Sequence, residues 1–167
     1  GCLSNKSPSD EPITRLQPLL GTFVSVTVYA EPIKAQTAIN AAFAEFRAVD
    51  RLLSIHREDS DLAKTNNGLE ISAELQPVLK QALSIARETE GAFDPTIRPL
   101  AELWGFIKKE GYRLPTDAEL RNVLPLVDYR QVELKDNILI KGKAGMSIDP
   151  GGFGKGYAVD RAISVLE

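Results

Sequence analysis

Four glycines lie close together near the end of this chain, at Gly151, Gly152, Gly154 and Gly156. Glycine can adopt positive φ and lets a ligand approach the main chain, and the first turn of a helix presents free N–H groups to negative charge. A short apolar segment ending at Asp149 precedes these glycines, and a predicted helix follows them. The stretch therefore predicts a turn that binds an anionic ligand, with phosphate as the first candidate. The alternative is a turn that only links a strand to a helix.

Two known phosphate-binding motifs do not fit this stretch. The P-loop requires glycine at the position of Asp149 and Ser or Thr at the position of Gly156. The dinucleotide-binding fingerprint requires a glycine at the position of Tyr157. Other parts of the chain must therefore decide what the glycine turn binds.

The composition indicates one globular domain. The chain has 167 residues, of which 43% are hydrophobic and 26% charged, and its net charge is −3. This length can bury a core, and the acidic balance offers no basic surface for nucleic acid. No apolar run approaches the roughly 20 residues needed to span a bilayer. Nucleic acid is not expected as a partner.

The single cysteine, Cys2, follows Gly1 and precedes a polar run from residue 3 to residue 12. One cysteine cannot form an intramolecular disulfide, and the single His56 excludes a zinc site of the His/Cys type. The start resembles that of a mature bacterial lipoprotein whose cysteine carries lipid, with residues 1–14 as a flexible tether and residues 15–167 as the domain. The alternative is a tag remnant beside an accidental cysteine.

Hydrophobic periodicity predicts the elements that must position the glycine turn. An alternating segment from residue 16 to residue 29, entered through Gly21, predicts a strand, and helices are expected at about 32–53 and 73–89. Capping residues predict short helices after Ser60 and Thr116, the latter with Glu119 in a capping box. The remaining predicted elements are a short apolar helical turn at 100–106 containing a core-packed Trp104, a hairpin at 131–140, a third strand at 145–148 and a helix at 157–166.

Strands and helices alternate without a regular βαβ period. The expected fold class is therefore α+β, a mixed sheet with packed helices, without a repeat or a second domain.

Four stretches, taken together, resemble the ApbE family of FAD:protein FMN transferases, once described as thiamine-biosynthesis lipoproteins. They are Leu20-Gly-Thr-Phe, Leu53-Ser-Ile-His-Arg-Glu-Asp-Ser followed by Asn66, Gly91-Ala-Phe-Asp-Pro-Thr with Leu103-Trp-Gly-Phe, and Ile148-Asp-Pro-Gly-Gly-Phe-Gly-Lys-Gly-Tyr-Ala-Val-Asp. Each stretch alone is weak, whereas all four in this order are specific. The resemblance covers nearly all residues from Leu19 onward and implies an ApbE-like, T-fold-like domain.

The resemblance implies a magnesium-dependent reaction on FAD. FAD is split at its pyrophosphate, FMN is joined to a threonine hydroxyl of a target flavoprotein, and AMP leaves. The family also implies a lipid anchor at Cys2 on the periplasmic face of the bacterial inner membrane. Two alternatives stay open within the resemblance: hydrolysis of FAD to FMN and AMP, and a flavin-binding lipoprotein without catalysis. A third alternative is an interaction module in which the glycine turn binds nothing.

The resemblance also implies particular site residues. The main-chain carbonyl of Gly154 matches the position that ligates magnesium. The residues matching FAD contacts are Leu20, His56, Asn66, Ala92, Phe93, Asp94, Gly151, Gly152, Lys155 and Tyr157. Two of them depart from the family pattern, because Leu20 replaces a common methionine and His56 a common tyrosine or other flat side chain.

Family members are roughly twice as long as this chain, so the resemblance implies the N-terminal half only. The remaining magnesium ligands and the catalytic residues would lie in the other half. Residues 1–167 alone are therefore expected to fold poorly and to be inactive in FMN transfer.

Overall fold

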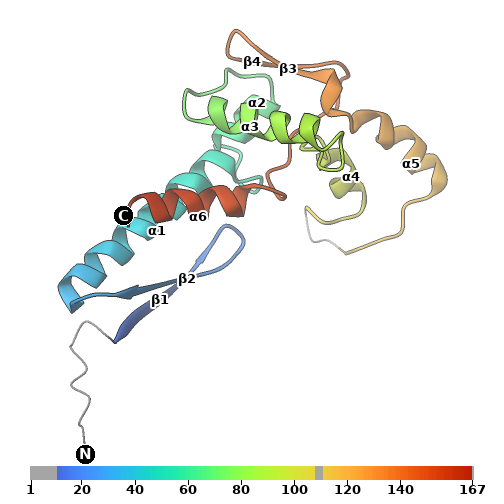
Figure 1. Cartoon of the computed structure of the whole chain (residues 1–167). Helices are drawn as coiled ribbons and strands as arrows, with labels where there is room; N and C mark the ends of the chain where they lie inside the picture. The colour runs from blue at the N-terminus through green and yellow to red at the C-terminus, as the bar shows by residue number, and fades with distance from the viewer. Residues whose placement is uncertain (1–10, 108–110, 167) are drawn as a thin grey trace, which may run out of the picture. The chain divides into compact units, whose positions relative to one another are not determined.

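The computed structural model of the protein describes residues 11–107 and 111–166, so the predicted lipidation site Cys2 lies outside the described residues. Its helices and strands are shown in Figure 1. In chain order they are β1 (Pro12–Leu19), β2 (Thr22–Tyr29), α1 (Pro32–Leu53), α2 (Asp61–Asn66), α3 (Leu75–Glu88), α4 (Arg98–Leu103), α5 (Asp117–Val123), β3 (Val132–Lys135), β4 (Ile138–Lys141) and α6 (Gly154–Ser164). This content confirms the predicted α+β class. The strands of the described residues form two separate antiparallel pairs, β1–β2 and β3–β4, in place of one mixed sheet.

The chain divides into two compact units. Among the described residues, the first unit comprises 11–50 and 154–166, and the second comprises 51–107 and 111–153. The first unit therefore contains the β1–β2 hairpin, most of α1, and α6. No helix within the described ranges is both long and apolar enough to cross a lipid bilayer.

The first unit begins with a two-stranded hairpin, whereas the sequence predicted a single strand in this region. β1 pairs with β2 from Pro12 opposite Tyr29 to Leu19 opposite Thr22. The turn residues Leu20 and Gly21 both have positive φ, at 54° and 69°, which is the backbone of a two-residue hairpin turn with the native strand twist. The prediction treated Gly21 as the entry to one strand, and so it missed β1. Residues 12–14, assigned to the tether, belong to this strand.

Helix α1 confirms its predicted bounds. Its apolar residues Ile39, Phe43, Phe46 and Val49 recur at helical spacing and are all buried. Helix α6 lies beside it within the first unit (Figure 1), where Arg161 Nη2 is 2.7 Å from Glu45 Oε2. The predicted helix at 157–166 is wrong at both ends, because α6 runs from Gly154 to Ser164. Gly154 and Gly156, which the prediction placed in the turn, adopt helical backbone.

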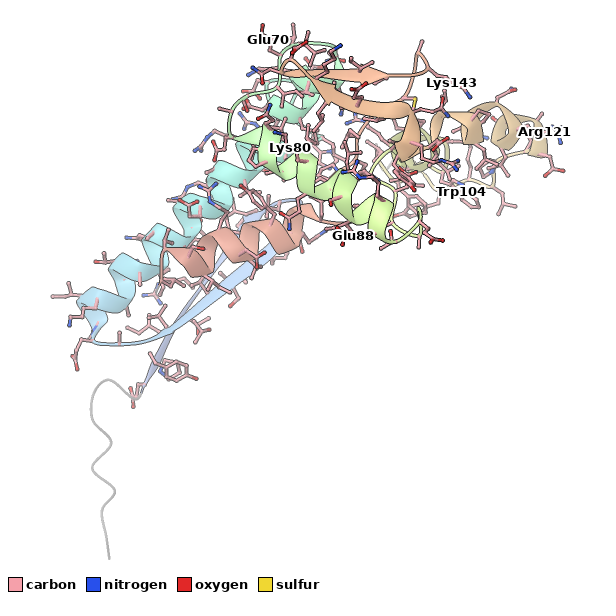
Figure 2. The ribbon with its side chains drawn as sticks, turned by 45° about the horizontal axis from the view of Figure 1, so that its top comes forward. Glu70, Lys80, Glu88, Trp104, Arg121 and Lys143 are labelled. Carbon is pink, nitrogen blue, oxygen red and sulfur yellow. The ribbon has the colours of Figure 1, made fainter. Side chains whose placement is uncertain are left out.

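The second unit is built on α3. Its buried residues recur at helical spacing: Leu75, Val78, Leu79, Ala82, Leu83 and Ala86. Each fully buried leucine contributes roughly 1.5–3 kcal/mol. Lys80 and Glu88, both exposed, lie along the same helix in Figure 2.

The predicted caps of α2 and α5 are confirmed. Ser60 Oγ accepts the Ala63 N–H at 3.0 Å at the start of α2, and Thr116 and Glu119 form a reciprocal capping box on α5. Before α3, Ser72 Oγ accepts the Leu75 N–H at 3.2 Å, although the N-cap position of α3 is Glu74.

The β3–β4 hairpin confirms its predicted position, with Asp136 and Asn137 in the turn at positive φ. The third strand predicted at 145–148 is wrong. The main chain of Ile148 bonds to a side chain, that of Asn66, and the N–H of Asp149 bonds to the carbonyl of Pro95. This segment is held by loops and forms no strand ladder.

Trp104 follows α4 (Figure 2) and is half-buried, whereas the sequence predicts a core position. Its ring stacks on that of Phe106 at a centroid distance of 6.4 Å, and Phe106 is itself exposed. The Trp104 side chain therefore packs within a surface aromatic cluster and not in the core. Contact with the Phe106 ring shields one face of the indole from solvent.

Candidate functional site

Two stretches far apart in the sequence meet in the second unit: residues 92–96 and residues 148–153. The Asp149 N–H donates to the Pro95 carbonyl at 2.8 Å. The Phe93 and Phe153 rings pack edge to face with centroids 6.3 Å apart. A Cβ placed on Gly152 would lie 3.0 Å from Phe93 Cε2. The structure therefore brings Phe93, a predicted contact residue, against the predicted glycine turn.

Asp94 has both carboxylate oxygens bonded by its own chain. Oδ1 accepts the Thr96 N–H at 2.8 Å and the Thr96 hydroxyl at 2.6 Å, and Oδ2 accepts the Tyr129 N–H at 2.9 Å. Thr96 is fully buried, and its Oγ1 in turn accepts the Asp128 N–H at 2.9 Å. The carboxylate thus ties the 94–96 turn to the chain at 128–129.

The Asp128 carboxylate continues this cluster. The Arg130 guanidinium and the Gln131 amide donate hydrogen bonds to it and hold the pKa of Asp128 well below its usual range. Such bonds favour the charged form. Asp128 is therefore a negatively charged residue beside the hydrogen bonds that hold the 94–96 turn.

Asn66, at the end of α2, uses both ends of its side-chain amide on one residue. Nδ2 donates to the Ile148 carbonyl at 2.9 Å, and Oδ1 accepts the Ile148 N–H at 2.8 Å. Its own carbonyl accepts from Lys141 Nζ at 2.7 Å. Asn66 thereby holds the segment that leads into the glycine turn.

At Gly151 and Gly152, contacts within the protein leave little room for a side chain. Asp149 Oδ1 accepts the Gly151 N–H at 2.6 Å, and a Cβ on Gly151 would lie 2.7 Å from that oxygen. The expectation that these glycines use positive φ is wrong: among the described residues, positive φ occurs at other glycines. Gly151 and Gly152 avoid clashes with Asp149 and Phe93, and both remain exposed.

Asp149, at the start of the glycine turn, has a buried carboxylate that is only partly hydrogen-bonded. It is only 7% exposed, and while Oδ1 bonds to Gly151, its Oδ2 is buried without a hydrogen-bond partner among the described residues. A buried carboxylate oxygen without a donor is costly. The sequence prediction missed Asp149 as a site residue. Two Asp-Pro pairs, at 94–95 and 149–150, are the signal that could have found it, because Asp side chains commonly bond the N–H two residues on.

The other predicted residues are distributed over both units. In the second unit, Ala92 and His56 are exposed, and the His56 N–H donates to Ser54 Oγ at 3.3 Å. In the first unit, Leu20 occupies the hairpin turn, and Gly154, Lys155 and Tyr157 form the start of α6. The Tyr157 hydroxyl accepts from Arg161 Nη1 at 3.2 Å. The structure brings together those predicted residues that lie on 92–94 and 151–152.

The described residues do not make a complete magnesium site. Magnesium binds oxygen ligands in near-octahedral geometry. No group of three or more His, Cys, Asp or Glu side chains that could hold a metal ion occurs among residues 11–107 and 111–166. The Gly154 carbonyl would be one ligand of six, so these residues alone do not fit the ion.

The sequence profile of the ApbE family matches residues 20–167. This match covers most of the chain, and the chain belongs to the ApbE family. The FAD:protein FMN transferase of Treponema pallidum is 28% identical over 167 residues, which span 92% of this chain and 46% of that protein. The corresponding protein of Haemophilus influenzae is 30% identical over 135 residues, which span 74% of this chain and 39% of that protein.

Solved structures agree with the family assignment. The ApbE protein of Thermotoga maritima matches with a TM-score of 0.85 and 33% identity, over 93% of this chain and 52% of that chain. The flavin transferase ApbE of Vibrio cholerae matches with a TM-score of 0.83 and 26% identity, over 93% of this chain and 53% of that chain. The chain spans about half the length of the relatives it matches.

Proposed function

We propose that the protein of which this chain is part is an FAD:protein FMN transferase that moves FMN from FAD to a threonine hydroxyl of a target flavoprotein and releases AMP. The curated relatives carry this name. The single observation that carries the proposal for this chain is the meeting of residues 92–96 with the glycine turn at Asp149–Phe153. This contact joins the two stretches in which the sequence predicts flavin contacts.

In this reaction the main task of the protein is to position FAD and the acceptor threonine. The threonine oxygen would bond to the phosphorus on the flavin side of FAD and release its proton to solvent. The bridging bond to the AMP phosphate would break, with AMP taking the electron pair. Phosphoryl transfer of this kind depends on orientation and charge stabilisation more than on covalent steps by the protein. A glycine turn fixed from both sides, by Asn66 and by Pro95, suits that requirement.

We propose two kinds of site residue. Ala92, Phe93, Gly151 and Gly152 would contact FAD directly, together with Leu20, His56, Lys155 and Tyr157 by the family match. Asp94 and Asn66 would act through the main chain they hold, because their side-chain polar atoms are engaged by the protein. This assignment moves both residues from ligand contacts to positioning residues.

Magnesium dependence is part of the proposal, with the Gly154 carbonyl as one ligand. The ion would stabilise the charge that develops on the leaving phosphate. The other ligands would come from the half of the family length that this chain does not span.

The proposal also includes a lipid on Cys2 that holds the protein at the periplasmic face of the bacterial inner membrane. The sequence at the start of the chain supports it, and Cys2→Ser tests it. The serine variant of the full-length protein should leave the membrane fraction, with its melting temperature unchanged. A serine variant that stays with the membranes contradicts the lipid anchor.

The experiment for the activity uses purified full-length protein, FAD, magnesium chloride and a flavoprotein acceptor carrying a target threonine. AMP release coupled to covalent flavin on the acceptor supports transfer. AMP release without acceptor labelling identifies an FAD pyrophosphatase instead, and FAD binding without AMP release identifies a flavin-binding protein. Affinity for FAD should exceed that for FMN, because the site is proposed to hold a pyrophosphate. Equal affinities contradict that part.

A further inference from the structure

Lys141 is a half-buried lysine on β4, which contacts α2 in the second unit (Figure 1). Its Nζ donates to the main-chain carbonyl of Asn66 at 2.7 Å, across 75 residues of sequence. Asn66 is the last residue of α2, and the carbonyls in the last turn of a helix have no partner within that helix. A cation at this end also interacts favourably with the helix dipole. Lys141 therefore fixes the end of α2 with a charge-assisted hydrogen bond.

The β3–β4 hairpin that carries Lys141 is itself fixed at its turn. The Asn137 carbonyl accepts the Ile71 N–H at 2.6 Å, and Asn137 Oδ1 accepts from Gln76 Nε2 at 2.9 Å. Gln76 lies in the first turn of α3, the helix on which the second unit is built. The ammonium group of Lys141 thus extends from a strand whose position the fold determines.

The Asn66 side chain connects Lys141 to the glycine turn. Its amide bonds to both the carbonyl and the N–H of Ile148, and the N–H of the next residue, Asp149, bonds to the Pro95 carbonyl. A continuous series of hydrogen bonds therefore runs from Lys141 to the two stretches that are proposed to hold FAD.

Lys143, two residues further along, makes a different contact. It is exposed (Figure 2), and its Nζ donates to the Pro125 carbonyl at 3.3 Å. Pro125 does not belong to the turns at 94–96 and 149–153. The two lysines have the same charge and lie close together in the sequence, but only Lys141 bonds to the residue that holds Ile148.

We propose that Lys141 is a positioning residue of the flavin site, which acts through Asn66 to keep the Ile148–Asp149 main chain in its binding arrangement before FAD arrives. This inference rests on the flavin-binding part of the proposed function. The apparent Kd of a site is its intrinsic Kd divided by the fraction of molecules already in the binding form. Loss of the Lys141 hydrogen bond would lower that fraction. In this role the ammonium group contacts Asn66 and not FAD.

The test is Lys141→Met in the full-length protein, titrated with FAD in the presence of EDTA. Methionine keeps most of the side-chain volume and removes the donor. We expect FAD affinity to fall about 5-fold to 10-fold. Lys141→Arg keeps a charged donor and should bind FAD more tightly than the methionine variant. The matched control is Lys143→Met, which should bind FAD like the wild type.

A double-mutant cycle with Asn66→Ala tests the route of this effect. The alanine variant lacks the amide that bonds to Ile148, so adding Lys141→Met to it should change FAD affinity less than about twofold. An equal loss in both backgrounds would mean that Lys141 acts on FAD by another route, and it would overturn the inference.

The remaining results separate this inference from the proposed function. A Lys141→Met variant with a lowered melting temperature but normal FAD affinity makes Lys141 a residue of the fold alone, which overturns the inference and leaves the proposed function intact. The expected loss of affinity in a protein that releases no AMP supports the inference and contradicts the transfer. A wild-type protein that binds no FAD overturns both.

If the methionine variant does not fold, a crystal structure of the unchanged protein with FAD decides the question. Hydrogen bonds from Lys141 to Asn66 and from Asn66 to Ile148 that persist beside bound FAD support the inference. An ammonium group of Lys141 that bonds to FAD, or an Asn66 amide that leaves Ile148 for FAD, overturns it.

Discussion

Two Asp-Pro turns lie against each other in the second unit, and they treat their carboxylates differently. In both turns, one Asp oxygen accepts the N–H two residues on, from Thr96 in the first and from Gly151 in the second. In the first turn the other oxygen of Asp94 bonds to Tyr129. In the second turn the other oxygen of Asp149 has no partner among the described residues.

The two carboxylates differ in how much hydrogen-bonding capacity they have left for a ligand. A carboxylate with both oxygens bonded by its own chain fixes a loop and has little capacity left for a ligand. A carboxylate that is equally well placed but only half bonded can still accept a donor. The same local motif therefore leaves Asp94 bonded through both oxygens and Asp149 through one, and four substitutions test what this contrast means for the two turns.

The largest effect is expected from Asp94→Ala. The change leaves the buried Thr96 hydroxyl and the N–H groups of Thr96 and Tyr129 without their acceptor, which should lower the free energy of unfolding by about 3 kcal/mol. Urea unfolding of the full-length protein measures it, with Asp160→Ala, at an exposed position of α6, as the control. A loss below about 1 kcal/mol, with FAD affinity strongly reduced, would show that Asp94 is a ligand contact and would remove the contrast with Asp149.

Asn66→Ala should have the next largest effect. It removes two hydrogen bonds to Ile148, worth about 2 kcal/mol together, and frees the segment before the glycine turn. Thermal unfolding measures the loss, and Asn67→Ala on the same helix end is the matched control. FAD affinity should fall as well, because the turn is less well held. Unchanged stability with reduced affinity would return Asn66 to a direct flavin contact.

Gly152→Ala should cost about 1 kcal/mol, because its new Cβ would lie 3.0 Å from Phe93 Cε2. Phe93→Leu in the same chain should restore part of the loss. Gly156→Ala is the opposite control, since no atom lies within 4 Å of its added Cβ and alanine is favoured over glycine in a helix. If Gly152→Ala is neutral and Gly156→Ala is destabilising, the packing described for the turn is wrong.

The smallest effect is expected from Thr65→Val. This near-isosteric change removes a buried hydroxyl without a partner among the described residues, so the free energy of unfolding should rise slightly or change by less than about 1 kcal/mol. FAD affinity should stay at the wild-type value. Reduced FAD affinity would mean that the Thr65 hydroxyl is a ligand acceptor.

Local signals in the sequence predicted much of the fold. Helical spacing located α1 and α3, and the cap residues Ser60 and Thr116 located α2 and α5. The errors occurred where long-range contacts decide the structure. Ile148 lies in an apolar run typical of a strand, yet its hydrogen bonds go to Asn66, 82 residues away. No local pattern predicts such a pairing.

In the candidate site, too, the sequence located the stretches but not the long-range contacts of their side chains. The family resemblance selected the stretches 92–94 and 151–152, which the structure brings together, but it assigned side-chain roles without knowing the partners. Whether Asp94 or Asn66 is free to bind a ligand depends on Tyr129 and Ile148, respectively, and only the folded chain shows those contacts. The free oxygen of Asp149 could not be predicted for the same reason.

We propose that the two Asp-Pro turns together form the flavin dinucleotide site. Hydrogen exchange of the full-length protein, followed by mass spectrometry with and without saturating FAD, tests it most directly. We expect FAD to slow exchange in peptides covering residues 92–97 and 149–153, while the β3–β4 hairpin exchanges as before. FAD binding that leaves both turns unprotected would contradict the claim.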